Sequence, residues 1–266
     1  MYDFQYAKPA RLADAVKMAA EADSKFIAGG MTLLPALKQR MARPSTLIDL
    51  SGIAELTGIS MQEGLLTIGA MTCHFEVASS ELVHAAIPSL AALAGTIGDQ
   101  QVRHRGTIGG SVANNDPNAD YPAGLLGLGA TIATDRRVIP ADDFFRGLFD
   151  TALDEGEVLT GVTFPIPDAA AYMKFPSPAS GYALIGVMVS RTGGNVRVAV
   201  TGGGHGVFRM ATAEAALAAD WSPQALAEIE VDHDLLTDDH SAPVHYKAAL
   251  IRVLTARAVT STIRPS

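Results

Sequence analysis

The sequence predicts an α+β protein in two parts, a larger N-terminal part over residues 1–165 and a smaller α+β part over residues 166–266. Three observations lead to this expectation. Short apolar segments typical of strands alternate with segments of helical periodicity up to residue 165. Pro165 and Pro167 then mark a candidate domain boundary. Beyond them a hairpin pattern precedes two helical segments, which is typical of a small α+β domain.

The first fifty residues predict a helix–strand–glycine turn–helix–strand unit, which is an α/β arrangement. Apolar residues from Leu12 to Ala20 follow helical spacing after Pro9. The segment KFIAGG predicts a short buried strand that ends in glycines, and STLIDL predicts a second strand. Between them, TLLPALKQRM predicts a helix with Thr32 as its N-cap.

The middle of the chain contains a segment that is polar between two apolar neighbours. A strand is predicted over residues 64–71, and a helix over residues 75–97 with an interruption near Pro88. The polar segment RHRGTIGGSVANNDPNADYPAG, residues 103–124, predicts a loop that either has no role or is shaped around a ligand. After it, GLLGLGATIATD and RRVIPADDFF predict short strands or turns, and EVLTGVTFPIP predicts a strand.

The last third of the chain predicts a hairpin followed by helices. GYALIGVMVS and NVRVAVTGGG resemble strands and flank the turn at residues 191–194, which contains two glycines. ATAEAALAAD and PVHYKAALIRVLTARAV then predict two helices.

Composition excludes several classes of function. Of 266 residues, 48% are hydrophobic and 18% are charged, which suits a chain with a substantial core. The formal net charge is −8, so we expect no nucleic-acid partner. We find neither the apolar core of a secretory signal nor an apolar run near the roughly 18 residues of a membrane span, and therefore expect a cytoplasmic protein without such a span. The single cysteine, Cys73, excludes a disulfide, a cysteine zinc site or an iron–sulfur cluster held by this chain alone.

The first candidate ligand site is a glycine turn made of Ala28, Gly29, Gly30, Met31 and Thr32. A strand–Gly-Gly–helix junction aims unpaired backbone N–H groups at one point, which suits a phosphate. Glycine also lets the backbone approach a ligand closely. The alternative is an ordinary turn between a strand and a helix, and spacing alone does not separate the two.

The second candidate site repeats this pattern with Thr107, Ile108, Gly109, Gly110 and Ser111. Two such turns in one chain could hold the two phosphates of a dinucleotide. A helix terminus contributes only about 0.3–1 kcal/mol towards an anion, whereas nanomolar binding needs about 12 kcal/mol. Buried ring systems and directed hydrogen bonds must therefore supply most of the affinity. A carboxylate such as Asp120 would repel phosphate, so we expect it to accept hydrogen bonds from sugar hydroxyls.

Three further patterns are not assigned to chemistry, and no catalytic side chain or metal site is predicted. Residues 202–206, GGGHG, lack the third glycine of a Rossmann fingerprint and predict a turn. VDHDLLTDDH, residues 231–240, does not match an EF-hand and predicts a solvated loop rather than a metal site. Cys73 and His74 would point to opposite faces of a strand, so they are not expected to form a thiolate–imidazole pair.

The paired motifs AGGMTLLPALK and RHRGTIGGSVANNDPNADYPA resemble those of a known family. The chain is similar to the FAD-binding medium subunits of molybdenum hydroxylases, the group that contains the flavoprotein subunits of carbon monoxide dehydrogenase and bacterial xanthine dehydrogenases. The resemblance extends over nearly the whole chain, including IGAMTCHFEVASS, YMKFPSPASGYALIGVMV and HYKAALIRVLTARA. Both glycine motifs in this order are fairly specific, whereas either alone is not.

The resemblance implies a fold, a cofactor and partners. The N-terminal part would be a two-part FAD-binding domain of the vanillyl-alcohol-oxidase (PCMH) type, residues 1–165, followed by a smaller α+β C-terminal domain, residues 166–266. Electrons would pass from iron–sulfur clusters of a partner through FAD to an external acceptor. The partners would be a small [2Fe–2S] subunit and a large molybdopterin subunit, and the assembly would be a dimer of heterotrimers.

The resemblance also implies which residues bind FAD. Its diphosphate would lie on the backbone from Ala28 to Leu33, and the second motif would bind through Thr107, Gly109, Gly110 and Ser111. Asp120 would hold flavin hydroxyls, and Lys174 matches a lysine near the flavin. Two residues depart from the family pattern: Met31 stands where a small or polar residue is usual, and Ser111 where Asn is common.

Two alternatives remain open at this point. One is a stand-alone flavin-dependent reductase or oxidase of the same fold. The other is a structural subunit whose flavin site has decayed, for which Met31 and Ser111 are the best support.

Overall fold

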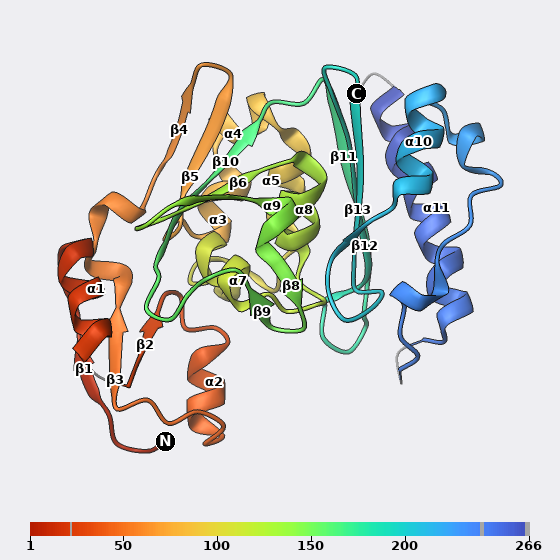
Figure 1. The fold of residues 1–266 in the computed structure, drawn as a ribbon. Coiled ribbons are helices and arrows are strands. Elements are labelled where there is room, and N and C mark those ends of the chain that lie inside the picture. Colours follow the sequence, from red (N-terminus) through yellow and green to blue (C-terminus); the bar gives the residue numbers. More distant parts are fainter. Residues whose placement is uncertain (22, 240–241, 264–266) are drawn as a thin grey trace.

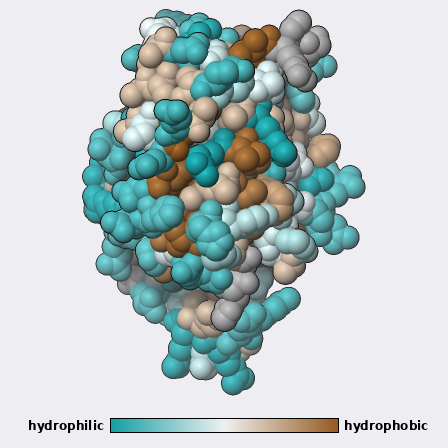
Figure 2. Space-filling view, turned by 90° about the vertical axis from the view of Figure 1, so that its right-hand side faces the viewer, coloured by the Kyte–Doolittle hydropathy of each residue, from teal (hydrophilic) through white to brown (hydrophobic). Residues whose placement is uncertain are grey.

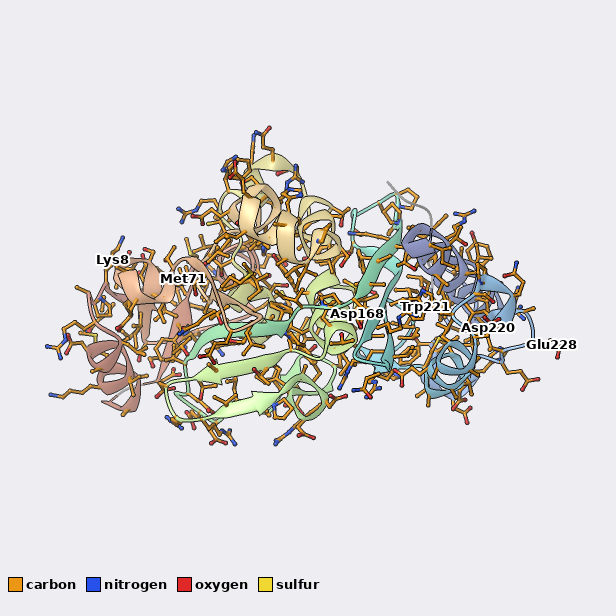
Figure 3. The ribbon with its side chains drawn as sticks, turned by 90° about the horizontal axis from the view of Figure 1, so that it is seen from above. Lys8, Met71, Asp168, Asp220, Trp221 and Glu228 are labelled. Atoms are coloured by element: carbon orange, nitrogen blue, oxygen red, sulfur yellow. The ribbon has the colours of Figure 1, made fainter. Side chains whose placement is uncertain are left out.

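A computed structural model of the chain describes residues 1–21, 23–239 and 242–263. Its elements form three groups that lie side by side, called here the N-terminal, central and C-terminal groups (Figure 1 and Figure 3). Each group is built on a sheet of its own, of three, five and four strands respectively. The mixed helix and strand content confirms the predicted α+β class.

The N-terminal group is a small parallel sheet with two helices, and it confirms the predicted helix–strand–turn–helix–strand order. The strand order is β1-β3-β2. Ala15 and Ile48 are fully buried in its core. Thr32 occupies the N-cap of α2, but its side chain makes no capping hydrogen bond there. The elements are β1 (Gln5–Ala7), α1 (Leu12–Glu21), β2 (Ser24–Ile27), α2 (Leu33–Lys38) and β3 (Thr46–Asp49).

The central group is an antiparallel sheet in the order β4-β5-β10-β6-β7, accompanied by the hairpin β8–β9. Its strand β5 (Leu65–Gly69) was predicted, whereas its edge partner β4 (Ile59–Gln62) is mostly exposed and carries no clear alternation of apolar residues. The other strands are β6 (Thr131–Thr134), β7 (Val138–Pro140), β8 (Phe145–Gly147), β9 (Asp150–Thr151) and β10 (Leu159–Pro165).

Helices cover the central sheet, and two of the predictions for this region are wrong in detail. The segment 75–97 is broken at Ser80 as well as at Pro88, because the Ser80 side chain caps α4 by accepting from the Val83 N–H at 3.4 Å. Residues 103–124 are largely helical rather than a loop. The helices are α3 (His74–Ser79), α4 (Glu81–Ala86), α5 (Pro88–Gly95), α6 (Gln100–Arg103), α7 (Ile108–Asn114), α8 (Asp120–Leu128) and α9 (Ala141–Phe144).

Helix α8 shows why the periodicity of the sequence did not predict a helix over residues 120–128. All nine of its residues are buried, so no polar face marks it as a helix in the sequence. It packs between the central group and the C-terminal sheet, where Ser190 Oγ donates to the Gly127 carbonyl oxygen at 2.6 Å. A side chain at Gly127 would collide with Met188, whose Cγ lies 2.6 Å from the position of such a Cβ.

The C-terminal group is an antiparallel sheet in the order β11-β12-β13-β14 with two helices on its outer face (Figure 1). The predicted hairpin is confirmed: Thr192 pairs with Asn195 across Gly193 and Gly194, which both have positive φ. Figure 2 shows the outer face, where apolar side chains are interspersed with polar ones. The elements are β11 (Ala169–Pro176), β12 (Ala183–Thr192), β13 (Asn195–Thr201), β14 (Phe208–Arg209), α10 (Ala211–Ala219) and α11 (Val244–Ile263).

The chain passes from the central sheet to the C-terminal sheet at the predicted domain boundary. Pro165 ends β10 and Ala169 begins β11. The apolar cores are not fully separate, because Met188 and Ala199 of the C-terminal sheet belong to the same buried cluster as Leu125 of α8. The division into domains 1–165 and 166–266 therefore stays a proposal.

The acidic segment 231–240 has structural contacts of its own. Asp232 accepts from the Asp234 N–H at 2.9 Å in a short helical turn. Asp239 pairs with the fully buried Lys247 of α11 at 2.6 Å, while His240 lies outside the described residues. In the described ranges, no three or more His, Cys, Asp or Glu residues are grouped so that they could hold a metal ion. Likewise, none of the helices there is long and apolar enough to cross a membrane.

Candidate functional site

The two glycine motifs, about eighty residues apart in sequence, meet in space. A Cβ on Gly29 would lie 2.0 Å from the Arg105 carbonyl oxygen, just before the second motif. A Cβ on Gly110 would lie 3.4 Å from the Cβ of Ala28 and 2.9 Å from Thr107 Oγ1. The motifs therefore form one cradle whose backbones approach more closely than any side chain would allow.

The first motif has free amide groups at this cradle. Gly30 turns the chain between β2 and α2 with a φ of +74°. Among the described residues, the N–H groups of Met31, Thr32 and Leu33 have no acceptor, because hydrogen bonding of α2 begins with Leu34 donating to Gly30. Met31 is 39% exposed. Such a cluster of unpaired donors suits a diphosphate.

The second motif differs from the first, because the amides of both of its glycines have acceptors within the chain. The Gly109 N–H donates to the Ala70 carbonyl at 2.8 Å, and the Gly110 N–H donates to Thr107 Oγ1 at 3.1 Å. The first bond joins α7 to Ala70, and the second caps α7. The two glycines therefore provide close packing, while the hydroxyls of Thr107 and Ser111 remain able to donate to a ligand.

Asp120 and Lys174, both predicted site residues, form a buried ion pair. Lys174 Nζ lies 2.9 Å from Asp120 Oδ2, with only 6% and 4% of the two side chains exposed. Tyr172 donates its hydroxyl to the other carboxylate oxygen at 2.5 Å. Burial raises the pKa of the Asp120 carboxyl, and the Lys174 charge and the Tyr172 hydroxyl oppose that rise. Each carboxylate oxygen retains a further lone pair for a ligand hydroxyl.

Two tyrosines at this place were missed by the sequence prediction. Tyr172 precedes Lys174 by two positions on β11, so both side chains lie on one face of the strand, and this alternation is the signal that could have found it. Tyr182 is 44% exposed. Burial, and secondarily the charges of Asp116 and Asp120, raise the pKa of Tyr182.

The segment between the second motif and Asp120 joins the central group to the C-terminal sheet. The Thr201 hydroxyl lies 2.8 Å from the carbonyl oxygens of both Pro117 and Ala119. The Gly202 N–H donates to the Pro117 carbonyl at 2.9 Å. Residues 202–207 form neither helix nor strand, which confirms the predicted turn. Through Gly202 this turn binds the segment that precedes Asp120.

Asn115, which the sequence left unassigned, clamps the β8–β9 hairpin. It ends α7 in the left-handed conformation, with a φ of 42°. Its buried Nδ2 donates to the carbonyls of Gly147 at 2.8 Å and Asp150 at 2.7 Å.

We expect Asn115→Gly to lower the free energy of unfolding by about 2 kcal/mol, because two hydrogen bonds are lost while the backbone conformation stays accessible. Asn115→Ala should cost about 1–2 kcal/mol more, because an L-residue is strained there. Urea unfolding measures both. Asn114→Ala is the control and should change little; an equal loss at Asn114 would contradict the clamp.

His74 lies directly behind the second motif. His74 is the first residue of α3, and Cys73 is the N-cap of this helix. The expectation that Cys73 and His74 lie together on a strand is therefore wrong. The His74 Nε2 is 2.6 Å from where a Cβ on Gly106 would lie. Burial, and secondarily the Arg103 charge, lowers the pKa of His74 from 6.5 to about 4.

We expect His74 to make the folded chain less stable as the pH falls. The unfolded imidazole binds a proton near pH 6.5, whereas the folded one stays neutral until about pH 4. The stability that depends on neutral His74 is complete above pH 6.5 and is lost as the pH falls towards 4. Urea unfolding at about pH 7 and about pH 5 measures the loss of stability between these two pH values, and His74→Gln should make this loss smaller. An identical loss in both proteins would contradict the assignment.

Comparison with known proteins gives the site its context. Residues 2–167 match the family model described as FAD binding domain in molybdopterin dehydrogenase. The chain is 38% identical over 212 residues to the carbon monoxide dehydrogenase medium chain of Hydrogenophaga pseudoflava, covering 74% of each chain. It is 33% identical to the nicotine 6-hydroxylase medium subunit of Paenarthrobacter nicotinovorans, covering 96% of this chain and 95% of that one.

Solved structures agree with these relatives along nearly the whole chain. A chain of carbon monoxide dehydrogenase from Hydrogenophaga pseudoflava superposes with a TM-score of 0.87 at 34% identity, covering 98% of both chains. A chain of quinoline 2-oxidoreductase from Pseudomonas putida 86 gives a TM-score of 0.84 at 30% identity, covering 98% of this chain and 97% of that one. The unpaired amides of Met31, Thr32 and Leu33, at the place where the two glycine motifs meet, fit the diphosphate of FAD. The chain belongs to the FAD-binding medium subunits of the molybdenum hydroxylases.

Proposed function

We propose that this chain is the electron-transferring flavoprotein subunit of a cytoplasmic complex with a small [2Fe–2S] subunit and a large molybdopterin subunit, assembled as a dimer of heterotrimers. The observation that carries the flavin part is the meeting of the two glycine motifs at one cradle. The single cysteine of the chain supports the placement of the iron–sulfur clusters in a partner.

The residues of the cradle divide the work of binding. The free amides of Met31, Thr32 and Leu33 donate to the diphosphate. Gly29 and Gly110 let the two motifs pack closely beside it, with Ala28 at their contact, and Gly30 turns the chain into α2. Gly109 packs closely against Ala70, where no side chain would fit. Thr107 and Ser111 donate through their hydroxyls.

The buried pair of Asp120 and Lys174 serves the flavin end of the ligand. Asp120 accepts from hydroxyls of the sugar chain, and Lys174 provides a positive charge close to them. FAD, when bound, supplies the chemistry of taking up electrons and releasing them to an external acceptor. The protein binds and orients the cofactor, and we assign no side chain as an acid or base.

The two departures from the family pattern are compatible with binding. Met31 is partly exposed and can still offer its backbone N–H, which has no acceptor among the described residues. Ser111 is half-buried in the first turn of α7 and keeps a hydroxyl donor. This geometry favours a functional flavin site over a decayed one.

Purification from the native host under mild conditions tests the assembly. We expect the chain to co-purify with two further subunits, together with iron and molybdenum in fixed ratio to FAD. A monomer that carries FAD would support the stand-alone reductase or oxidase instead. A complex with iron and molybdenum in which this chain lacks FAD would support the decayed structural subunit.

A further inference from the structure

Two donors on one strand hold the two oxygens of a single buried carboxylate. The Tyr172 hydroxyl lies 2.5 Å from Asp120 Oδ1, and the Lys174 ammonium lies 2.9 Å from Asp120 Oδ2. Both donors come from β11, while Asp120 begins α8 in the central group. The orientation of this carboxylate is therefore set from the C-terminal sheet.

The neighbouring strand leaves space for the Tyr172 hydroxyl. Gly186 on β12 lies opposite Lys174, and a Cβ there would be 2.3 Å from the Tyr172 hydroxyl oxygen. Glycine at this position thus permits Tyr172 to reach Asp120. Tyr121, the residue after Asp120, is also fully buried, but its hydroxyl has no partner among the described residues.

We propose that Tyr172 is a positioning residue for FAD: its hydroxyl fixes Oδ1 of Asp120, so that the carboxylate keeps Oδ2 on Lys174 and presents one orientation to the hydroxyls of the bound cofactor. This inference rests on the proposed function, because it assumes that Asp120 accepts from FAD. It adds a residue outside both glycine motifs, and it makes the C-terminal sheet part of the binding site.

The charged and titratable groups that interact with Asp120 lie on β11, on α8 and in the segment between β11 and β12. Lys174 and Tyr172 belong to β11, Tyr121 to α8 itself, and Tyr182 to the segment between β11 and β12. Lys174 is also held by the Thr96 carbonyl oxygen at the end of α5, at 3.4 Å. Of these groups, Lys174 and Tyr172 favour the ionised carboxylate. Removing the Tyr172 hydroxyl should therefore raise the pKa of Asp120.

FAD binding to the full purified chain, measured by titration across acidic and neutral pH, tests this role. Tyr172→Phe is expected to weaken FAD binding about tenfold at neutral pH, since a hydrogen bond to a charged group is lost. The loss of affinity on acidification should also begin at higher pH than in the unmodified chain. The matched control is Tyr121→Phe, which removes the unpartnered hydroxyl of the buried residue that follows Asp120 and should leave both properties unchanged.

A second variant keeps the test independent of the tyrosine itself. Gly186→Ala crowds the Tyr172 hydroxyl and should reproduce both effects of Tyr172→Phe. If Tyr172→Phe lowers the melting temperature but leaves the affinity and its pH dependence unchanged, Tyr172 is only structural and the inference is overturned. Equal effects of Tyr172→Phe and Tyr121→Phe would overturn it as well. An unmodified chain that binds no FAD at any pH would overturn the proposed function itself, which is a distinguishable result.

Discussion

Gly110→Val is expected to abolish retention of FAD. A Cβ at this position would lie 2.9 Å from Thr107 Oγ1 and 3.4 Å from the Cβ of Ala28, and valine adds two further methyl groups. The side chain would displace the Thr107 cap and push the two glycine motifs apart. We expect binding to weaken by at least about a hundredfold, equivalent to roughly 3 kcal/mol, as measured by the FAD content of the purified variant.

The matched control for this variant is Gly95→Ala. Gly95 lies in α5, and a Cβ there would meet only Ala78, at 4.0 Å. We expect this variant to retain FAD fully and to be slightly stabilised, because alanine favours a helix more than glycine does. Full FAD content in Gly110→Val would show that the cradle is not the binding site.

Lys174→Met is expected to destabilise the folded chain by about 3–5 kcal/mol, because it leaves the Asp120 charge buried without its partner. Only 4% of the Asp120 side chain is exposed, so water cannot replace the ammonium. Urea unfolding at neutral pH measures the change. Combining it with Asp120→Leu should recover a large part of the loss, since no unpaired charge then remains in the interior.

Lys247→Met is the control that removes a buried lysine without leaving a buried, unpaired carboxylate. Lys247 is fully buried, but 45% of the side chain of its partner Asp239 is exposed, so that water can solvate this carboxylate. We expect a clearly smaller loss of stability than for Lys174→Met. Equal losses in the two variants would contradict the special role of the buried Asp120 pair.

The parts of the fold that depend on local signals could be predicted from the sequence. The C-terminal hairpin follows from two glycines between two β-rich segments, and the first helix from its apolar spacing after Pro9. Both glycine motifs could be found because each stands between apolar segments. That they belong to one site came from a family resemblance, and the structure gives the reason in the contact of Gly29 with Arg105.

The parts that depend on distant contacts could not be predicted in this way. Helix α8 has no polar face, because it is enclosed between two groups of elements, so the sequence predicts a loop for its first half and short strands or turns for the rest. The donation of the Gly109 amide to Ala70 depends on a contact across the fold, which no local pattern specifies. The Asp120–Lys174 pair joins residues 54 positions apart, which no local pattern specifies.

The FAD content of the purified, unmodified chain tests the central claim most directly, namely that the two glycine motifs together bind FAD. The cofactor is released from the protein by denaturation, and the free flavin is identified and its concentration is compared with that of the chain. We predict the visible absorbance of a flavoprotein and one FAD per chain, either as purified or after reconstitution with FAD. A colourless protein that cannot be reconstituted with FAD would contradict the claim.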